Sequence, residues 1–141
     1  MKTFTLSCIA LAMMVSCATK KNDQSEADCP PKACTMEFRT VGVIFKDAQG
    51  DTISVKDFSV KLKSTGKKLP SASSGTQQPT SPFYLVANDG DKSALAVSGD
   101  TLLISGKHPT TNAVKTSEMV ISGGRCACHI TRVSGNEVIT F

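Results

Sequence analysis

Residues 41–63 read VGVIFKDAQGDTISVKDFSVKLK, and this stretch decides the fold class. Apolar side chains recur at every second position from Val41 to Phe45, and again from Phe58 to Leu62. A period of two is typical of strands that bury one face, and the DAQGD sequence between the two runs is rich in turn formers. The stretch therefore predicts half-buried strands separated by a turn.

The same period continues along the 141-residue chain, and no segment after residue 17 shows a helical period over a useful length. Further strands are predicted at 83–87, 94–97, 101–105 and 115–122. We expect one all-β domain over residues 36–141, an antiparallel β-sandwich of about seven to eight strands. The alternative is an up-and-down barrel that holds a small apolar ligand.

The end of the chain predicts a tight hairpin. Gly135-Asn136 is typical of a two-residue hairpin loop, and Arg125–Ser134 and Glu137–Phe141 would form its two arms. Alternation along these arms assigns one group of side chains to the core: Cys126, Cys128, Ile130, Ile139 and Phe141. The opposite, solvated face would carry Ala127, His129, Thr131 and Thr140.

The first residues form a targeting segment. Lys2 precedes an apolar run from Phe4 to Val15, which is too short to span a bilayer. The sequence Met14-Val15-Ser16-Cys17 that follows resembles the lipobox of bacterial lipoproteins. The resemblance implies that residues 1–16 are a signal peptide and that Cys17 becomes a lipidated, palmitate-bearing N-terminus. The alternative is ordinary cleavage after Ala18.

The lipobox resemblance also implies a location and a membrane partner. Ala18, rather than Asp, after the cysteine implies a lipid-anchored protein of the outer membrane, on its periplasmic or its surface-exposed face. Residues 17–35 are then the lipidated cysteine and a polar tether, because the sequence from 18 to 33 offers nothing that could form a core. A second polar stretch, 64–82, is interpreted as a mobile loop or as a loop that contacts a ligand.

Four cysteines remain after removal of the signal peptide: Cys29, Cys34, Cys126 and Cys128. Disulfides are expected in an oxidising envelope compartment. Two residues on one strand are too far apart for a Cys126–Cys128 bond, so each of them would pair with Cys29 or Cys34, in either connectivity. The alternative is a zinc or copper(I) site made by Cys126, Cys128 and His129.

Composition and spacing give little support to catalysis or nucleic-acid binding. The net charge of +4 has no basic cluster that would favour a nucleic-acid partner. The two histidines, His108 and His129, are both interpreted as surface residues, and Asp89 and Asp91 as parts of a turn rather than calcium ligands. We therefore expect no catalytic residue and no cofactor.

The sequence VIFKDAQGD at residues 43–51 resembles the opening strand and turn of carboxypeptidase-regulatory or transthyretin-like sandwich domains. That resemblance implies a non-catalytic module for stability, adhesion or carbohydrate contact, and it transfers no site residue. We expect a lipid-anchored, non-enzymatic interaction module with a protein or carbohydrate partner. The alternative function is envelope metal binding by the Cys-Ala-Cys-His segment.

Overall fold

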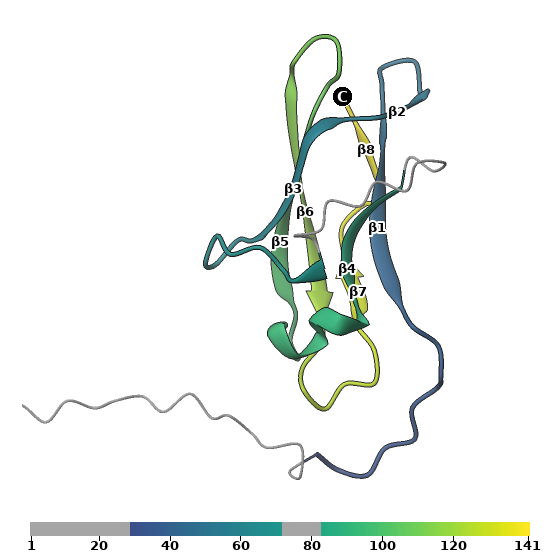
Figure 1. The fold of residues 1–141 in the computed structure, drawn as a ribbon, viewed down its shortest axis with the longest axis vertical. Helices are drawn as coiled ribbons and strands as arrows, with labels where there is room; N and C mark the ends of the chain where they lie inside the picture. The colour runs from purple at the N-terminus through teal and green to yellow at the C-terminus, as the bar shows by residue number, and fades with distance from the viewer. Residues whose placement is uncertain (1–28, 72–82) are drawn as a thin grey trace, which may run out of the picture.

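The computed structural model describes residues 29–71 and 83–141, which form two four-stranded sheets packed face to face (Figure 1). One sheet consists of β1 (Thr40–Lys46), β2 (Thr52–Ile53), β4 (Phe83–Asn88) and β8 (Val138–Thr140). The other consists of β3 (Lys56–Leu62), β5 (Asp100–Lys107), β6 (Val114–Ser122) and β7 (Thr131–Ser134). A short 3-10 helix, η3 (Asp89–Ala94), follows β4. The prediction of an all-β sandwich is confirmed.

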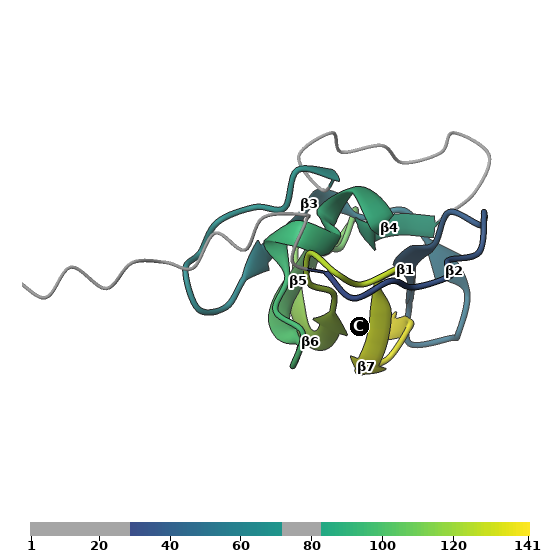
Figure 2. The same cartoon turned by 90° about the horizontal axis from the view of Figure 1, so that it is seen from below.

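The pairing is antiparallel throughout the two sheets, except that β8 runs parallel to β1. The second sheet has the order β3-β5-β6-β7, and in the first sheet β1 pairs with β2, β4 and β8. Figure 2 shows the two layers from below. The predicted targeting segment 1–16 and the predicted lipidation site Cys17 lie outside the described residues.

Side chains from both sheets fill the core, and an aromatic cluster lies within it. The buried ring of Phe45 contacts Phe58, Tyr84 and Phe141, with ring centroids 6.2, 5.4 and 5.9 Å apart. The hydroxyl of Tyr84 accepts a hydrogen bond from the backbone N–H of Val55 at 2.7 Å. The chain has no tryptophan, so these four smaller aromatic rings supply the largest apolar side chains of the core.

The predicted hairpin around Gly135-Asn136 is wrong. β7 pairs with β6 and β8 pairs with β1, so residues 135–137 cross from one sheet to the other. Gly135 has φ +104°, and a Cβ there would lie 2.7 Å from the Cα of Met119. In its observed position β8 buries Ile139 and brings Phe141 against the aromatic cluster. Core burial has therefore outweighed the local turn preference.

Of two further predicted strands, the one at 125–134 is observed only over Thr131–Ser134 and the one at 94–97 is not observed. Residues 123–130 form a loop between β6 and β7, so Cys126 and Cys128 do not lie on a strand that faces the core, although Ile130 is buried as predicted. The predicted strand at 94–97 is the end of η3 and a turn, within which Leu95 is buried against the core. In the predicted loop 64–82, Leu69 is buried in the core; residues 72–82 lie outside the described part.

Candidate functional site

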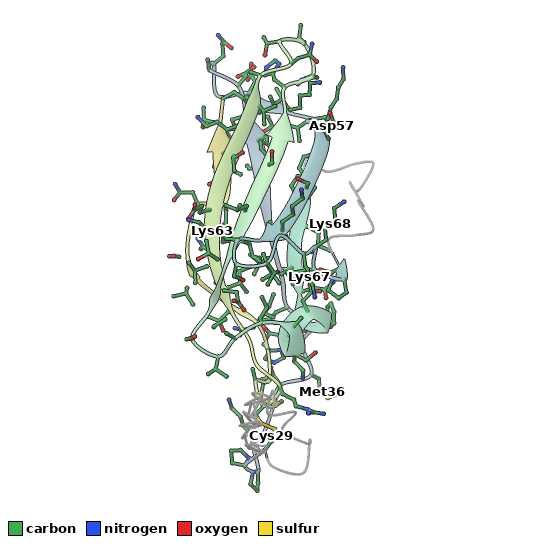
Figure 3. The ribbon with its side chains drawn as sticks, turned by 90° about the vertical axis from the view of Figure 1, so that its left-hand side faces the viewer. Cys29, Met36, Asp57, Lys63, Lys67 and Lys68 are labelled. Carbon is green, nitrogen blue, oxygen red and sulfur yellow. A yellow bond between two sulfur atoms is a disulfide. The ribbon has the colours of Figure 1, made fainter. Side chains whose placement is uncertain are left out.

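The two ends of the sandwich differ in construction. At one end, residues 29–39 run alongside the 123–130 loop and the start of η3; we call this arrangement the disulfide junction (Figures 1 and 3). At the other end lie the β1–β2 turn, the β5–β6 loop and the C-terminus (Figure 1), and residues of these three segments line a pocket. Each end is a candidate site.

Two disulfides hold the junction together. Cys29 is bonded to Cys126 and Cys34 to Cys128, with Cα atoms 5.3 Å apart in both pairs. The prediction that each C-terminal cysteine pairs with an N-terminal one is confirmed, and the connectivity that the sequence left open is now assigned. Residues 29–34 are fixed to the loop after β6, although they are largely exposed themselves.

The carboxylate of Asp89 joins three segments of the junction by hydrogen bonds. It accepts hydrogen bonds at 2.8 Å from the backbone N–H of Arg39, which precedes β1, and from that of Ile130, which precedes β7. Its Oδ2 also lies 2.7 Å from Nδ1 of His129. Burial alone would raise the pKa of Asp89, but these three hydrogen bonds outweigh burial and hold its pKa below the ordinary value.

The sequence predicted that His129 lies on a solvated strand face, and this prediction is wrong. Its side chain is only 12% exposed, and its Nε2 lies 2.8 Å from Oγ1 of Thr35. In the neutral tautomer of His129 whose Nδ1–H donates a hydrogen bond to Asp89, Nε2 accepts one from the Thr35 hydroxyl. The order hydroxyl–imidazole–carboxylate is the one found in nucleophilic triads. In this structure the same carboxylate also receives the backbone N–H groups of two adjoining segments, which makes it a structural link.

The cysteines of the Cys-Ala-Cys-His segment are not available as thiolates in this oxidised form, because both sulfurs are bonded to other sulfurs. Within residues 29–71 and 83–141, no group of three or more histidine, cysteine or acidic side chains is placed to hold a metal ion. The turn that contains Asp91 is part of a helix cap: its carboxylate accepts from the backbone N–H of Asn88 at 2.9 Å.

The pocket at the opposite end has a volume of about 610 Å³ and is open to solvent. We call it the distal pocket. Its lining is Asp47, Ala48, Gln49, His108, Thr110, Thr111, Ala113, Val114, Lys115 and Phe141. The Asp47 carboxylate shapes one wall, because it accepts from the backbone N–H groups of Gln49 and Asp51 at 3.0 and 2.9 Å. Apolar side chains and a few polar groups together are typical of a small-molecule or side-chain site.

His108 holds the other wall of the distal pocket. Its Nδ1 accepts from the backbone N–H groups of Thr110 and Thr111, each at 3.2 Å, and its ring meets Phe141 edge-on with centroids 5.1 Å apart. Because Nδ1 is the acceptor, the ring proton of neutral His108 lies on Nε2. The sequence suggested only a surface histidine here. The sequence His108-Pro109-Thr110-Thr111 indicated a loop at this position, but it gave no indication of a pocket.

No family model, curated protein or solved structure that was compared with this chain matches it. In the part of the chain that the structure describes, no helix has both the length and the apolar character needed to cross a bilayer. The function must therefore be argued from the two ends of the sandwich.

Proposed function

We propose that the chain is a lipid-anchored outer-membrane protein whose β-sandwich is a non-catalytic binding module, with the distal pocket as its binding site. One observation carries this proposal: the loops whose residues line the distal pocket and the segments of the disulfide junction lie at opposite ends of the sandwich (Figure 1). A chain that is tethered at Cys17 would present the pocket away from the anchor. Loops gathered at one end of a sandwich are a common place for binding sites.

The lining of the distal pocket supports a partner with an apolar group and a hydrogen-bond acceptor. Val114, which is 66% exposed, and the ring of Phe141 both contribute apolar surface to the lining. Nε2–H of His108 and the ammonium group of Lys115 are two of the hydrogen-bond donors among the lining residues. A side chain of a protein partner or a carbohydrate would satisfy both requirements.

Mass spectrometry of the non-reduced mature protein tests the anchor. We expect a new N-terminus at Cys17 with the mass of the lipid, and two disulfides. A Cys17→Ser variant is the matched control and should leave the membrane fraction. An unlipidated wild-type chain that begins after Ala18 would contradict the anchor but would not affect the binding site.

Photo-crosslinking in living cells tests the binding site. A benzophenone side chain is placed at Val114 in the distal pocket, or at Val133 on β7, which is also exposed. We expect a defined adduct from position 114 that His108→Ala reduces, and no such adduct from position 133. Equal labelling from both positions, or none from position 114, would refute a role for the pocket.

The two rival functions have direct tests. A fluorophosphonate probe, which reacts with activated hydroxyls, is expected to leave the protein unlabelled; labelling at Thr35 would contradict a non-catalytic module. Envelope metal binding by Cys126, Cys128 and His129 predicts free thiols and stoichiometric zinc or copper in the purified protein. We expect neither free thiols at these positions nor bound metal.

A further inference from the structure

The disulfide junction exposes two large apolar side chains. Met36 is fully exposed, at 101% of its reference area, and Phe38 is 66% exposed (Figure 3 labels Met36 at this end, near Cys29). Both lie in the short segment between Cys34 and the start of β1. Exposed methionine and phenylalanine side chains two residues apart indicate a contact surface rather than scattered surface apolarity.

The segment that carries these side chains is fixed on both sides. On one side, Cys34 is bonded to Cys128 and Thr35 lies 2.8 Å from the imidazole of His129. On the other side, Arg39 donates its N–H to the Asp89 carboxylate at 2.8 Å, and the Arg39 carbonyl accepts from the N–H of Asp89 at 3.1 Å. The chain therefore holds Met36 and Phe38 in solvent by means of a preorganised frame, which reduces the entropy cost of docking.

The charges around this surface are mainly positive. Lys32 and Arg125 are exposed, one on each of the two loop segments that the disulfides join. Arg39 follows Phe38 in sequence and forms an ion pair with Glu37. Apolar side chains that are flanked by cations fit the interface of a membrane with anionic lipids, where the head groups attract Lys and Arg and the apolar groups enter the acyl boundary.

The chain length to the proposed anchor places a bilayer within reach. Only eleven residues lie between Cys17 and Cys29, so in any conformation this link of twelve residue steps spans at most about 40 Å. Tethering at that distance gives the membrane a high effective concentration at the junction, and a weak contact then becomes well populated. This step rests on the proposed lipid anchor.

We propose that the disulfide junction docks on the membrane surface, with Met36 and Phe38 inserted at the head-group level and Lys32 and Arg125 against anionic lipid. The partner is the phospholipid bilayer that holds the anchor. Docking fixes the orientation of the sandwich and directs the distal pocket away from the lipid.

Because the sequence contains no tryptophan, the fluorescence of a single introduced tryptophan can be assigned to its position. Phe38→Trp places a single indole on the proposed contact, and Val114→Trp places one at the distal pocket, where the side chain is equally exposed at 66%. The lipidated protein is reconstituted into vesicles of phosphatidylethanolamine and phosphatidylglycerol, with or without brominated acyl chains. We expect a blue-shifted emission and strong quenching for Phe38→Trp, and neither change for Val114→Trp.

A second measurement separates the docking surface from the lipid anchor. The chain from residue 17 onward with Cys17→Ser, in its oxidised form, is mixed with the same vesicles. We expect weak binding that falls about tenfold in Met36→Ser, since burial of one such side chain is worth about one factor of ten. We expect no fall in Val114→Ser, and loss of the binding in vesicles of phosphatidylcholine alone.

The outcomes are distinguishable. Unshifted and unquenched emission of Phe38→Trp in the lipidated protein would overturn the docking proposal while the anchor stands. A protein with its native Cys17 that is found without lipid at that residue, but still inserts Phe38→Trp, would overturn the anchor and support the docking surface. A blue shift that appears with an added envelope protein and not with lipid would assign the surface to a protein partner and refute our proposal.

Discussion

Removal of the two disulfides one at a time and together is expected to give strongly non-additive losses of stability. The perturbations are the serine pairs Cys29→Ser with Cys126→Ser, Cys34→Ser with Cys128→Ser, and all four substitutions together. The two bonds connect nearly the same points of the chain, with sequence separations of 97 and 94 residues. Each bond therefore constrains almost the same unfolded loop.

The expected magnitudes follow from loop-closure entropy. Either bond alone closes a loop of almost a hundred residues and stabilises the fold by ~4.7 kcal/mol at 25 °C. Once one bond exists, the cysteines lie five positions apart in sequence on one side and two positions apart on the other, so the second bond closes a loop of only about seven residues, worth ~2.4 kcal/mol. Loss of one pair should thus cost about 2.4 kcal/mol, and loss of both about 7 kcal/mol.

Urea denaturation of the four proteins, followed by circular dichroism without reductant, measures these differences. The combined loss approaches the total stability of an ordinary small domain, ~5–15 kcal/mol, so the four-serine variant should be partly or largely unfolded in buffer. A single-pair loss close to half of the combined loss would refute the reasoning, because it would mean that the two bonds act independently.

Further substitutions test the contacts that hold the two sheets and the junction. Asp89→Asn should lower the free energy of unfolding by about 2–4 kcal/mol, since its charged oxygens accept two backbone N–H groups and an imidazole. Because the folded-state pKa of Asp89 is lowered, its stabilisation is complete above pH 4–5 and is lost as pH falls through the folded-state pKa. The wild type should therefore lose stability below about pH 4 more steeply than Asp89→Asn in urea titrations at each pH. Gly135→Ala should cost ~2–3 kcal/mol, whereas Gly50→Ala, also at positive φ but with nothing within 4 Å of its Cβ, should cost ~1 kcal/mol in the same assay. Tyr84→Phe removes the acceptor of the buried Val55 N–H and should lower thermal stability by ~1–3 kcal/mol; an unchanged melting temperature would contradict this assignment.

The strands that the sequence predicted correctly are those whose burial is set by local alternation. Val43 and Phe45 in β1, and Val60 in β3, are buried as the period of two requires. The end of the chain was predicted incorrectly because Gly135-Asn136 indicates a turn but does not determine which strand the following residues pair with. Whether Ile139 then pairs with β7 or with β1 depends on where the core lies, and that information is not local.

Only part of the disulfide junction could be predicted, because its other contacts also depend on residues that are far apart in sequence. Geometry excluded a Cys126–Cys128 bond, and this was enough to predict links between the two ends of the chain. The role of Asp89 was not predictable, because its partners Arg39 and His129 lie 50 and 40 residues away in sequence. A carboxylate in an NDGD sequence has an ordinary local explanation as a turn residue, and its long-range hydrogen bonds leave no sequence pattern.

The doubled disulfide also bears on how a tethered domain resists being pulled. A load on the proposed anchor would reach the fold first at Cys29, and from there it has two routes. One route continues along residues 30–39 into β1, the strand that pairs with β2, β4 and β8. The other crosses the Cys29–Cys126 bond into the loop between β6 and β7, in the opposite sheet. The covalent junction therefore divides the load between β1 in one sheet and the loop between β6 and β7 of the other. With the proposed anchor at Cys17, the two disulfides would support the attachment of the domain as well as its folding.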